Sequence, residues 1–536
     1  MKNCDMKIIN SISFKKSTLL GGVTVALMVI FSCSKDFLDV SPDDTINPDT
    51  FYKTEADAIA GAFSVYELLS SNDPYERYHM IGRNIWSDDA WGTSFTAGQY
   101  EPIGQGTHSP SFGMINQVWG FFYNMIRRSN VFLANVDNTE MDAGLRERLK
   151  AEVRFLRAFA YQELTFLYGD VPLITEVVPV EDAKNTTRTS KAEVVNFVLS
   201  ELEATANVLP PSYSGLDVGR ATKGAADALR CRVLMFENNF TEAINAAQDV
   251  MAGPYNLETN FGDIFKLANE NNEEVIFDIQ YLTAGWDYLN AQQLYSLPPS
   301  LGGWTGSSPS QSLVDEFETS DGLDINESGS GYDPDNPFDN RDPRLGQSII
   351  FPGETIDGVT LDPWNTDSAD RLGGGNSTTT GYWIKKFYDN TLPTAQDGTN
   401  YILIRYAEVL LNYAEAVNET SGPTAEVYNT LNSIRSRVGM PDLPVGLGQG
   451  EMRERILHER RVELAFEGDR FYTIRRHRIA EQVVPQDILG AVNPASGTNV
   501  LANTGRLFDP AKDYLWPIPQ EEIDLSEGVI TQNPNW

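Results

Sequence analysis

Side chains that could carry out catalysis are scarce in this chain of 536 residues. Histidine is the commonest general base, and two histidines on one helical turn are a usual zinc site. None of the four histidines has such a spacing, and the sequence contains no Gly-x-Ser-x-Gly turn and no phosphate-binding glycine loop. The residue types therefore favour a binding protein over an enzyme. The four histidines are His79, His108, His458 and His477.

Clustered carboxylates are a second source of possible chemistry, because two carboxyl groups can act as an acid and a base. Three of them recur every fourth residue and so share one helical face. Arg460 and Arg470 lie close by in the sequence, which makes ion pairing the favoured interpretation. Carboxylates are also abundant, with 75 Asp and Glu residues, so their presence decides nothing. The residues concerned are Glu408, Glu415, Glu459, Glu463 and Glu467.

One acidic, glycine-rich stretch could bind calcium, which prefers oxygen ligands. Its spacing does not fit an EF-hand, since no glutamate closes a twelve-residue loop. A solvated acidic loop is the favoured interpretation, a structural calcium the alternative, and no other cofactor is expected. The candidate ligands are Asp321, Asp324, Asp333 and Asp335.

The N-terminus predicts export and a lipid anchor. Lysines precede an apolar run from Leu19 to Phe31, which is shorter than the ~20 residues that span a bilayer. The residues Ile30–Cys33 resemble the bacterial lipobox, in which the cysteine is acylated. Residues 1–32 are therefore predicted to be a signal peptide, and residues 33–50 a tether lipidated at Cys33. The alternative is an ordinary signal peptide cut near this point.

Composition narrows the classes of partner. The formal charge of −34 disfavours nucleic acid and anionic membrane surfaces, both of which need basic patches. Hydrophobic residues make up 41% of the chain, so the acidity does not indicate disorder. Cys231 lies in an apolar helical pattern and is expected to be buried.

Most of the chain has the apolar periodicity of helices. Two helix pairs, 222–237 with 240–252 and 402–418 with 424–437, alternate small and large apolar residues as tetratricopeptide repeats do. Residues 256–400 are instead rich in glycine and proline, with short strand-like runs such as 275–279. We expect a mainly α protein with a loop-rich, mixed insertion, and long insertions of this kind are often functional.

Several motifs in this order resemble the SusD/RagB family of outer-membrane lipoproteins from Bacteroidetes. The resemblance spans nearly the whole chain that follows Cys33. It rests on Phe37–Asp39 (FLD), Gly169–Leu173 (GDVPL), Asn340–Leu345 (NRDPRL), Arg405–Leu411 (RYAEVLL), Glu459–Arg470 (ERRVELAFEGDR), Trp516–Pro519 (WPIP) and Gln532–Pro534 (QNP).

The resemblance implies a SusD-like fold with an N-terminal helical domain, 51–255, and a C-terminal RagB/SusD domain, 256–536. It also implies a non-catalytic, cell-surface protein that captures oligo- or polysaccharide. The expected partner is a SusC-like TonB-dependent transporter in the outer membrane. Two alternatives stay open: binding of peptides or another nutrient by the same fold, and a tetratricopeptide-type envelope scaffold.

A sugar site needs large exposed rings with planar polar groups around them, because sugars present apolar C–H faces. Two stretches of the sequence supply such residues, and the resemblance implies that the family assembles its glycan site from loops at these two places. A core position is an equal alternative for Trp86, and Trp364 and Trp383 are possible rim residues. The first stretch contains Trp86, Asp88, Asp89, Trp91 and Tyr100, and the second Trp286, Tyr288, Asn290, Tyr295 and Trp304.

Overall fold

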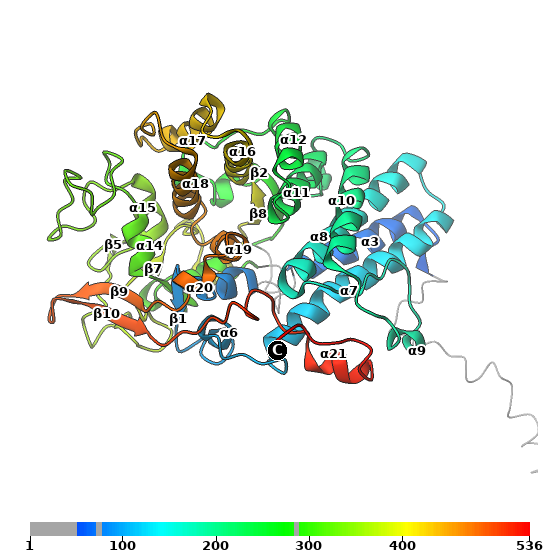
Figure 1. The fold of residues 1–536 in the computed structure, drawn as a ribbon, viewed down its shortest axis with the longest axis horizontal. Coiled ribbons are helices and arrows are strands. Elements are labelled where there is room, and N and C mark those ends of the chain that lie inside the picture. Colours follow the sequence, from blue (N-terminus) through cyan, green and yellow to red (C-terminus); the bar gives the residue numbers. More distant parts are fainter. Residues whose placement is uncertain (1–50, 71–77, 284–288) are drawn as a thin grey trace, which may run out of the picture.

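The computed structural model describes residues 51–70, 78–283 and 289–536, and helices dominate it (Figure 1). The N-terminal half contributes a group of long helices. The first helix of the group is capped at its start, since Thr54 accepts a hydrogen bond from the backbone N–H of Asp57. Its members are α3 (Glu55–Tyr66), α7 (Gly113–Asn135), α8 (Ala143–Tyr168), α10 (Lys191–Ala206), α11 (Lys223–Phe236) and α12 (Phe240–Met251).

The second group of helices continues the first without a break in packing. Helix α8 packs on α7 and α10, α10 on α11, α11 on α12, and α12 on α16, although residues 252–405 separate the last two in sequence. The predicted helix pairs are therefore confirmed as neighbours in one array. The second group consists of α16 (Tyr406–Ser421), α17 (Ala425–Arg437), α18 (Gln449–Glu463) and α19 (Asp469–Arg476).

The predicted helix 402–418 is wrong at its start. Residues Tyr401–Arg405 form strand β8, which pairs antiparallel with β2 (Val275–Ile279), and α16 begins only at Tyr406. The apolar residues Ile402 and Ile404 satisfy a strand pattern as well as a helical one, and pairing with β2 decides between them. The predicted strand at 275–279 is confirmed.

Short strands and helices fill the loop-rich side of the molecule (Figure 1). Four further antiparallel pairs join β1 to β3, β4 to β7, β5 to β6 and β9 to β10. The strands are β1 (Ala90–Gly92), β3 (Ser307–Pro309), β4 (Ile349–Ile350), β5 (Thr355–Ile356), β6 (Val359–Thr360), β7 (Trp383–Ile384), β9 (Ile488–Asn493) and β10 (Thr498–Asn503). The short helices of this side are α5 (Arg83–Ile85), α6 (Glu101–Gln105), α13 (Gln292–Ser296), α14 (Gln311–Glu316), α15 (Pro343–Ser348) and α20 (Ala480–Val483). Two more, α9 (Val180–Ala183) and α21 (Gln520–Leu525), lie on the side of the long helices (Figure 1).

The main core joins both groups of helices. An aromatic cluster at its centre places Trp86 edge-on to Trp516, 5.2 Å between ring centroids, with Tyr78 and Phe471 alongside. Cys231 is buried, as the sequence predicts. Among the described residues, no helix is long and apolar enough to cross a membrane.

Candidate functional site

The two aromatic stretches of the sequence meet in the structure. Strand β1 pairs with β3, which places Trp91 opposite Ser308. The Thr93 hydroxyl donates to the carbonyl of Thr305 at 2.7 Å, and the backbone N–H of Ser310 donates to the carbonyl of Asp89. Loops that are far apart in the sequence are thus held side by side.

At this junction three aromatic rings form a surface cluster, which we call the Trp304 cluster: Phe95, Tyr295 and Trp304. Phe95 stacks on Tyr295 with 5.7 Å between centroids and meets Trp304 edge-on at 5.5 Å. The Trp304 side chain is 41% exposed, whereas Tyr295 is buried beneath and Phe95 is half-buried. The cluster therefore offers one large ring to solvent, supported by Phe95, which in turn stacks on Tyr295.

The loop that carries Trp304 is folded tightly against α13. The backbone N–H groups of Trp304 and Gly306 donate to the carbonyls of Leu294 and Tyr295, both at 2.6 Å. A Cβ atom on Gly303 would lie 1.9 Å from the carbonyl of Leu297, so only glycine fits this close approach. The backbone thus fixes the position of the indole.

The other predicted platforms of the first stretch are not exposed. Trp86 is 1% exposed and its Nε1–H donates to the carbonyl of Tyr100, which is itself buried. Trp91 is buried under the guanidinium of Arg506. The core alternative for Trp86 is therefore the correct one, and an exposed role for Trp91 is wrong, because the core around Trp516 and the β1–β3 pairing draw both rings inward.

The predicted polar contacts are also buried and already paired. Asp88 forms ion pairs with Arg470 at 2.8 Å and with Arg461 at 3.1 Å, and Asp89 pairs with Arg461 at 2.8 Å. Burial alone would raise the pKa of Asp88, but the two guanidinium groups outweigh it and hold the pKa well below its usual range. These carboxylates anchor the loop to the C-terminal helices, so an expected contact with sugar hydroxyls is wrong for them.

Asn290 is likewise structural. Its side-chain N–H donates to the carbonyl of Thr399 at 2.7 Å, and its side-chain oxygen accepts from the backbone N–H of Gln292, which leaves it buried at the base of α13. Trp383 is wholly buried in β7 and is no rim residue, while Trp364 is half-buried against a small apolar cluster. Trp286, Tyr288 and Cys33 lie outside the described residues.

Phe95 is the member of the Trp304 cluster that the sequence analysis missed. It lies three residues after the last β1–β3 pair, between Ser94 and Thr96. Its surroundings of small polar residues are the same signal that singles out Trp304, but a phenylalanine is a less obvious platform than a tryptophan.

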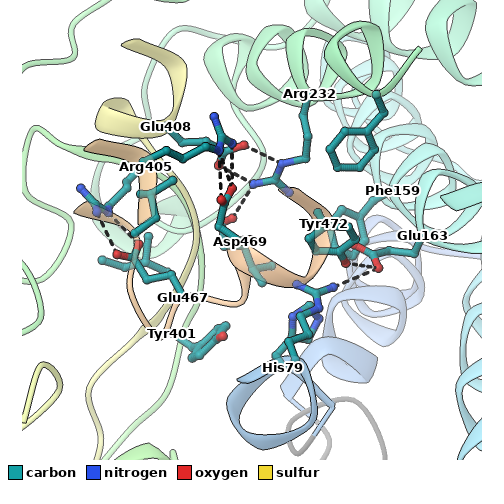
Figure 2. A pocket seen from close by; sticks show the side chains of 16 residues that line it. His79, Phe159, Glu163, Arg232, Tyr401, Arg405, Glu408, Glu467, Asp469 and Tyr472 are labelled. Atoms are coloured by element: carbon teal, nitrogen blue, oxygen red, sulfur yellow. Dashed lines mark hydrogen bonds and ion pairs between the residues drawn. The ribbon is translucent and has the colours of Figure 1, made fainter. Parts of the chain in front are cut away.

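A buried cavity of about 40 Å³ lies where the two groups of helices meet, and it contains many charged groups (Figure 2). The charges are paired across it. Arg232 binds Glu408, Arg405 binds Glu467, and Arg83 binds Glu163, which also accepts from the Tyr472 hydroxyl. These pairs connect α8 and α11 to the C-terminal helices.

The predicted ion pairing of the motif glutamates is confirmed, but the partners are not the arginines adjacent in sequence. Glu463 binds Arg344, Arg405 and Arg437, all within 2.9 Å. Arg460 pairs instead with Asp469, and Arg470 with Asp88. Glu415 pairs with Arg476, which holds the pKa of the carboxyl well below its usual range although burial raises it.

The acidic loop has local, turn-forming contacts. The carboxylates of Asp324 and Asp333 accept the backbone N–H groups of Asn326 and Asp335. Within residues 51–70, 78–283 and 289–536, no group of three or more His, Cys, Asp or Glu side chains is placed to hold a metal ion. Calcium binding through Asp321, Asp324, Asp333 or Asp335 stays a prediction.

Comparison with known proteins places this chain in a recognised class. A family model described as "SusD family" matches residues 273–536, and a model described as "Starch-binding associating with outer membrane" matches residues 36–235. The two models together span most of the chain, and the chain belongs to the SusD family.

Individual relatives agree with this assignment. SusD-like protein P25 of Formosa agariphila is 27% identical over 87% of this chain and 91% of its own. A SusD-like carbohydrate-binding protein of Bacteroides fragilis is 29% identical, covers 89% of this chain and 99% of its own, and superposes with a TM-score of 0.82. A laminarin-binding SusD-like protein gives a TM-score of 0.70 at 25% identity, with 90% and 100% covered. The predicted mainly α, SusD-like fold is confirmed.

Proposed function

We propose that this protein is a non-catalytic glycan-binding lipoprotein of the outer cell surface, anchored through Cys33. It captures an oligo- or polysaccharide and passes it to a SusC-like TonB-dependent transporter. Membership of the SusD family supports this proposal, as do the names of relatives that bind carbohydrate and laminarin.

The observation that carries the proposal is the exposed indole of Trp304 on its rigid loop. Sugar rings stack their C–H faces on aromatic rings, and a tryptophan gives the largest such surface. Phe95 meets the indole edge-on and stacks in turn on Tyr295, and the Thr93–Thr305 hydrogen bond joins the two loops. Trp286 and Tyr288, which precede α13 in the sequence, are proposed as further platforms.

Calorimetry tests this proposal directly. A version lacking residues 1–33 is titrated with a panel of polysaccharides that includes laminarin and starch, alongside Trp304→Ala and Phe63→Ala. Phe63 is a matched control, because it is 45% exposed but lies on α3 outside the Trp304 cluster. We expect binding to at least one glycan, a loss of tenfold or more for Trp304→Ala, which is about 1.4 kcal/mol, and no change for Phe63→Ala.

The outcomes separate the alternatives. Absence of binding to every glycan rejects the proposed function and favours a peptide ligand or a scaffold. Full glycan binding by Trp304→Ala keeps the function but rejects this site. Chromatography of the polysaccharide after prolonged incubation is expected to show unchanged chain length, and any cleavage would contradict the non-catalytic assignment.

A further inference from the structure

Thr305, the residue after Trp304, has an unusual backbone conformation. Its φ angle is +41°, in the left-handed region that a branched Cβ atom disfavours. It is the only β-branched residue with a positive φ in the part of the chain that the structure describes. Most of the other non-glycine residues with a positive φ are asparagine or aspartate, such as Asn340 and Asp357, and Gly302 takes such a conformation in the same loop without steric cost. The side chain at position 305 must therefore make contacts that offset this strain.

Hydrogen bonds on both sides hold Thr305 in place. Its backbone N–H and its hydroxyl donate to the same acceptor, the carbonyl of Leu297, at 3.2 and 3.1 Å. Its own carbonyl accepts the Thr93 hydroxyl at 2.7 Å, and the residue is fully buried. The Leu297 carbonyl is also the oxygen that a Cβ atom on Gly303 would meet, so the loop from Gly303 to Thr305 is wound around this one atom. The hydroxyl of Thr305 adds a second hydrogen bond to it.

The φ angle of Thr305 decides how Trp304 is placed relative to strand β3. Rotation about the N–Cα bond of Thr305 turns the preceding peptide, which carries Trp304, against the chain that continues into β3. That following chain is fixed, since the backbone N–H of Gly306 donates to the carbonyl of Tyr295 at 2.6 Å. A change of φ to the usual negative range would thus swing the indole away from the ring of Phe95, which it meets at 5.5 Å. The backbone strain at Thr305 and the position of the indole are therefore linked.

We propose that Thr305 is a positioning residue for the glycan site: its hydroxyl, bonded to the Leu297 carbonyl, holds the strained backbone that fixes the Trp304 indole. This inference rests on the proposed function, because its consequence is the strength with which a sugar stacks on the indole. Thr305 is fully buried and acts only through Trp304. Strain of this kind persists where the surrounding structure holds it, and it gathers at functional sites. A threonine that only closed the turn would affect the fold as a whole and not the binding through Trp304.

The test uses the full-length, lipidated protein in mild detergent, with calorimetry against laminarin, starch and the other polysaccharides of the panel. Thr305→Val keeps the branched shape without the hydroxyl, Thr305→Ser keeps the hydroxyl, and Thr305→Gly removes the side chain and relieves the backbone strain. Thr165→Val is the control. Thr165 is also buried and its hydroxyl donates to the carbonyl of Tyr161 at 2.9 Å, but it lies in the regular helix α8. Thr305→Val is also made together with Trp304→Ala.

We expect the two variants without a hydroxyl, Thr305→Val and Thr305→Gly, to bind glycan more weakly by about fivefold or more. Thr305→Ser and Thr165→Val should stay within about twofold of the wild type, the first because it restores the hydroxyl and the second because its lost hydrogen bond is remote from the site. In the Trp304→Ala background Thr305→Val should cause no further loss, since the two residues act on the same contact.

Wild-type affinity in Thr305→Val and Thr305→Gly overturns the inference, and so does a further loss in the Trp304→Ala background. A loss in Thr305→Ser as large as in Thr305→Val overturns the part assigned to the hydroxyl. Hydrogen exchange tests the same inference without a ligand, because the backbone amides of residues 303–306 should exchange faster in Thr305→Val and Thr305→Gly than in the wild type and Thr305→Ser. Unchanged exchange overturns the inference. Faster exchange in a protein whose wild type binds no glycan rejects the proposed function and leaves the hold of Thr305 on the loop standing.

Discussion

The indole of Trp304 meets the ring of Phe95 edge-on, with 5.5 Å between ring centroids and 61° between ring planes. The two residues come from different aromatic stretches of the sequence, and their contact shows that the stretches form one surface. The Thr93–Thr305 hydrogen bond beside them holds the loops in this arrangement.

Replacing Thr93 with valine should loosen this junction. The variant keeps the shape of the side chain but loses the hydrogen bond to the Thr305 carbonyl, which contributes about 1 kcal/mol. We expect a small fall in the melting temperature and a several-fold weaker glycan affinity, measured by calorimetry. Thr355→Val is the control, since Thr355 bonds only to Thr360 on an exposed hairpin. Unchanged affinity for Thr93→Val would show that the junction does not position Trp304.

Trp86 should contribute to stability and not to binding. Its ring is buried against Trp516, so Trp86→Ala is expected to lower the free energy of unfolding by roughly 3–5 kcal/mol. The fraction that remains folded at low temperature should bind glycan with wild-type affinity. Urea unfolding and calorimetry on the same sample check both statements. A loss of glycan affinity in fully folded Trp86→Ala would contradict this prediction and show that Trp86 contributes to binding.

Glu463 is the carboxylate on which a buried network depends. Glu463→Gln leaves Arg344, Arg405 and Arg437 with too little negative charge, and the expected loss of unfolding free energy is roughly 3–5 kcal/mol. Glu527→Gln removes the partner of Lys184 in an ion pair whose two side chains are more than half exposed, and it should change stability by less than about 1 kcal/mol. Similar effects in both variants would contradict the difference in burial.

Asp278 should make stability fall as the pH rises. Burial raises the pKa of this carboxyl to about 6, despite hydrogen bonds from Gln280 and Asn400 that lower it. The folded state therefore holds a proton that the unfolded chain releases near its ordinary pKa of about 4. The stabilisation is complete below about pH 4 and is lost by about pH 6. Urea unfolding from pH 4 to 7 measures this effect. The free energy of unfolding of Asp278→Asn should rise relative to that of the wild type as the pH increases. A constant difference between the two proteins would refute the assignment.

The helical array could be predicted from the sequence because each helix has its own apolar periodicity. For the candidate site, the sequence predicted which two stretches meet but not which of their side chains are exposed. Trp86 and Trp304 are both followed by a small hydroxyl residue, and the structural difference between them is the long-range contact of Trp86 with Trp516. Asp88 lies in a polar sequence typical of a solvent-exposed loop, but its partners Arg461 and Arg470 belong to two distant helices, α18 and α19. Whether such a side chain is exposed depends on tertiary contacts with distant residues, which the local sequence does not reveal.

The tight fold of the loop around Gly303 has a consequence for recognition. Because the backbone N–H groups of Trp304 and Gly306 are already bonded to α13, a ligand need not order this loop as it binds. In the proposed site the indole would act as a fixed template, so that a glycan must match its position and tilt in order to stack on it. A change of specificity in such a protein would follow from moving the loop, and differences in affinity between ligands would appear chiefly in how fast they dissociate.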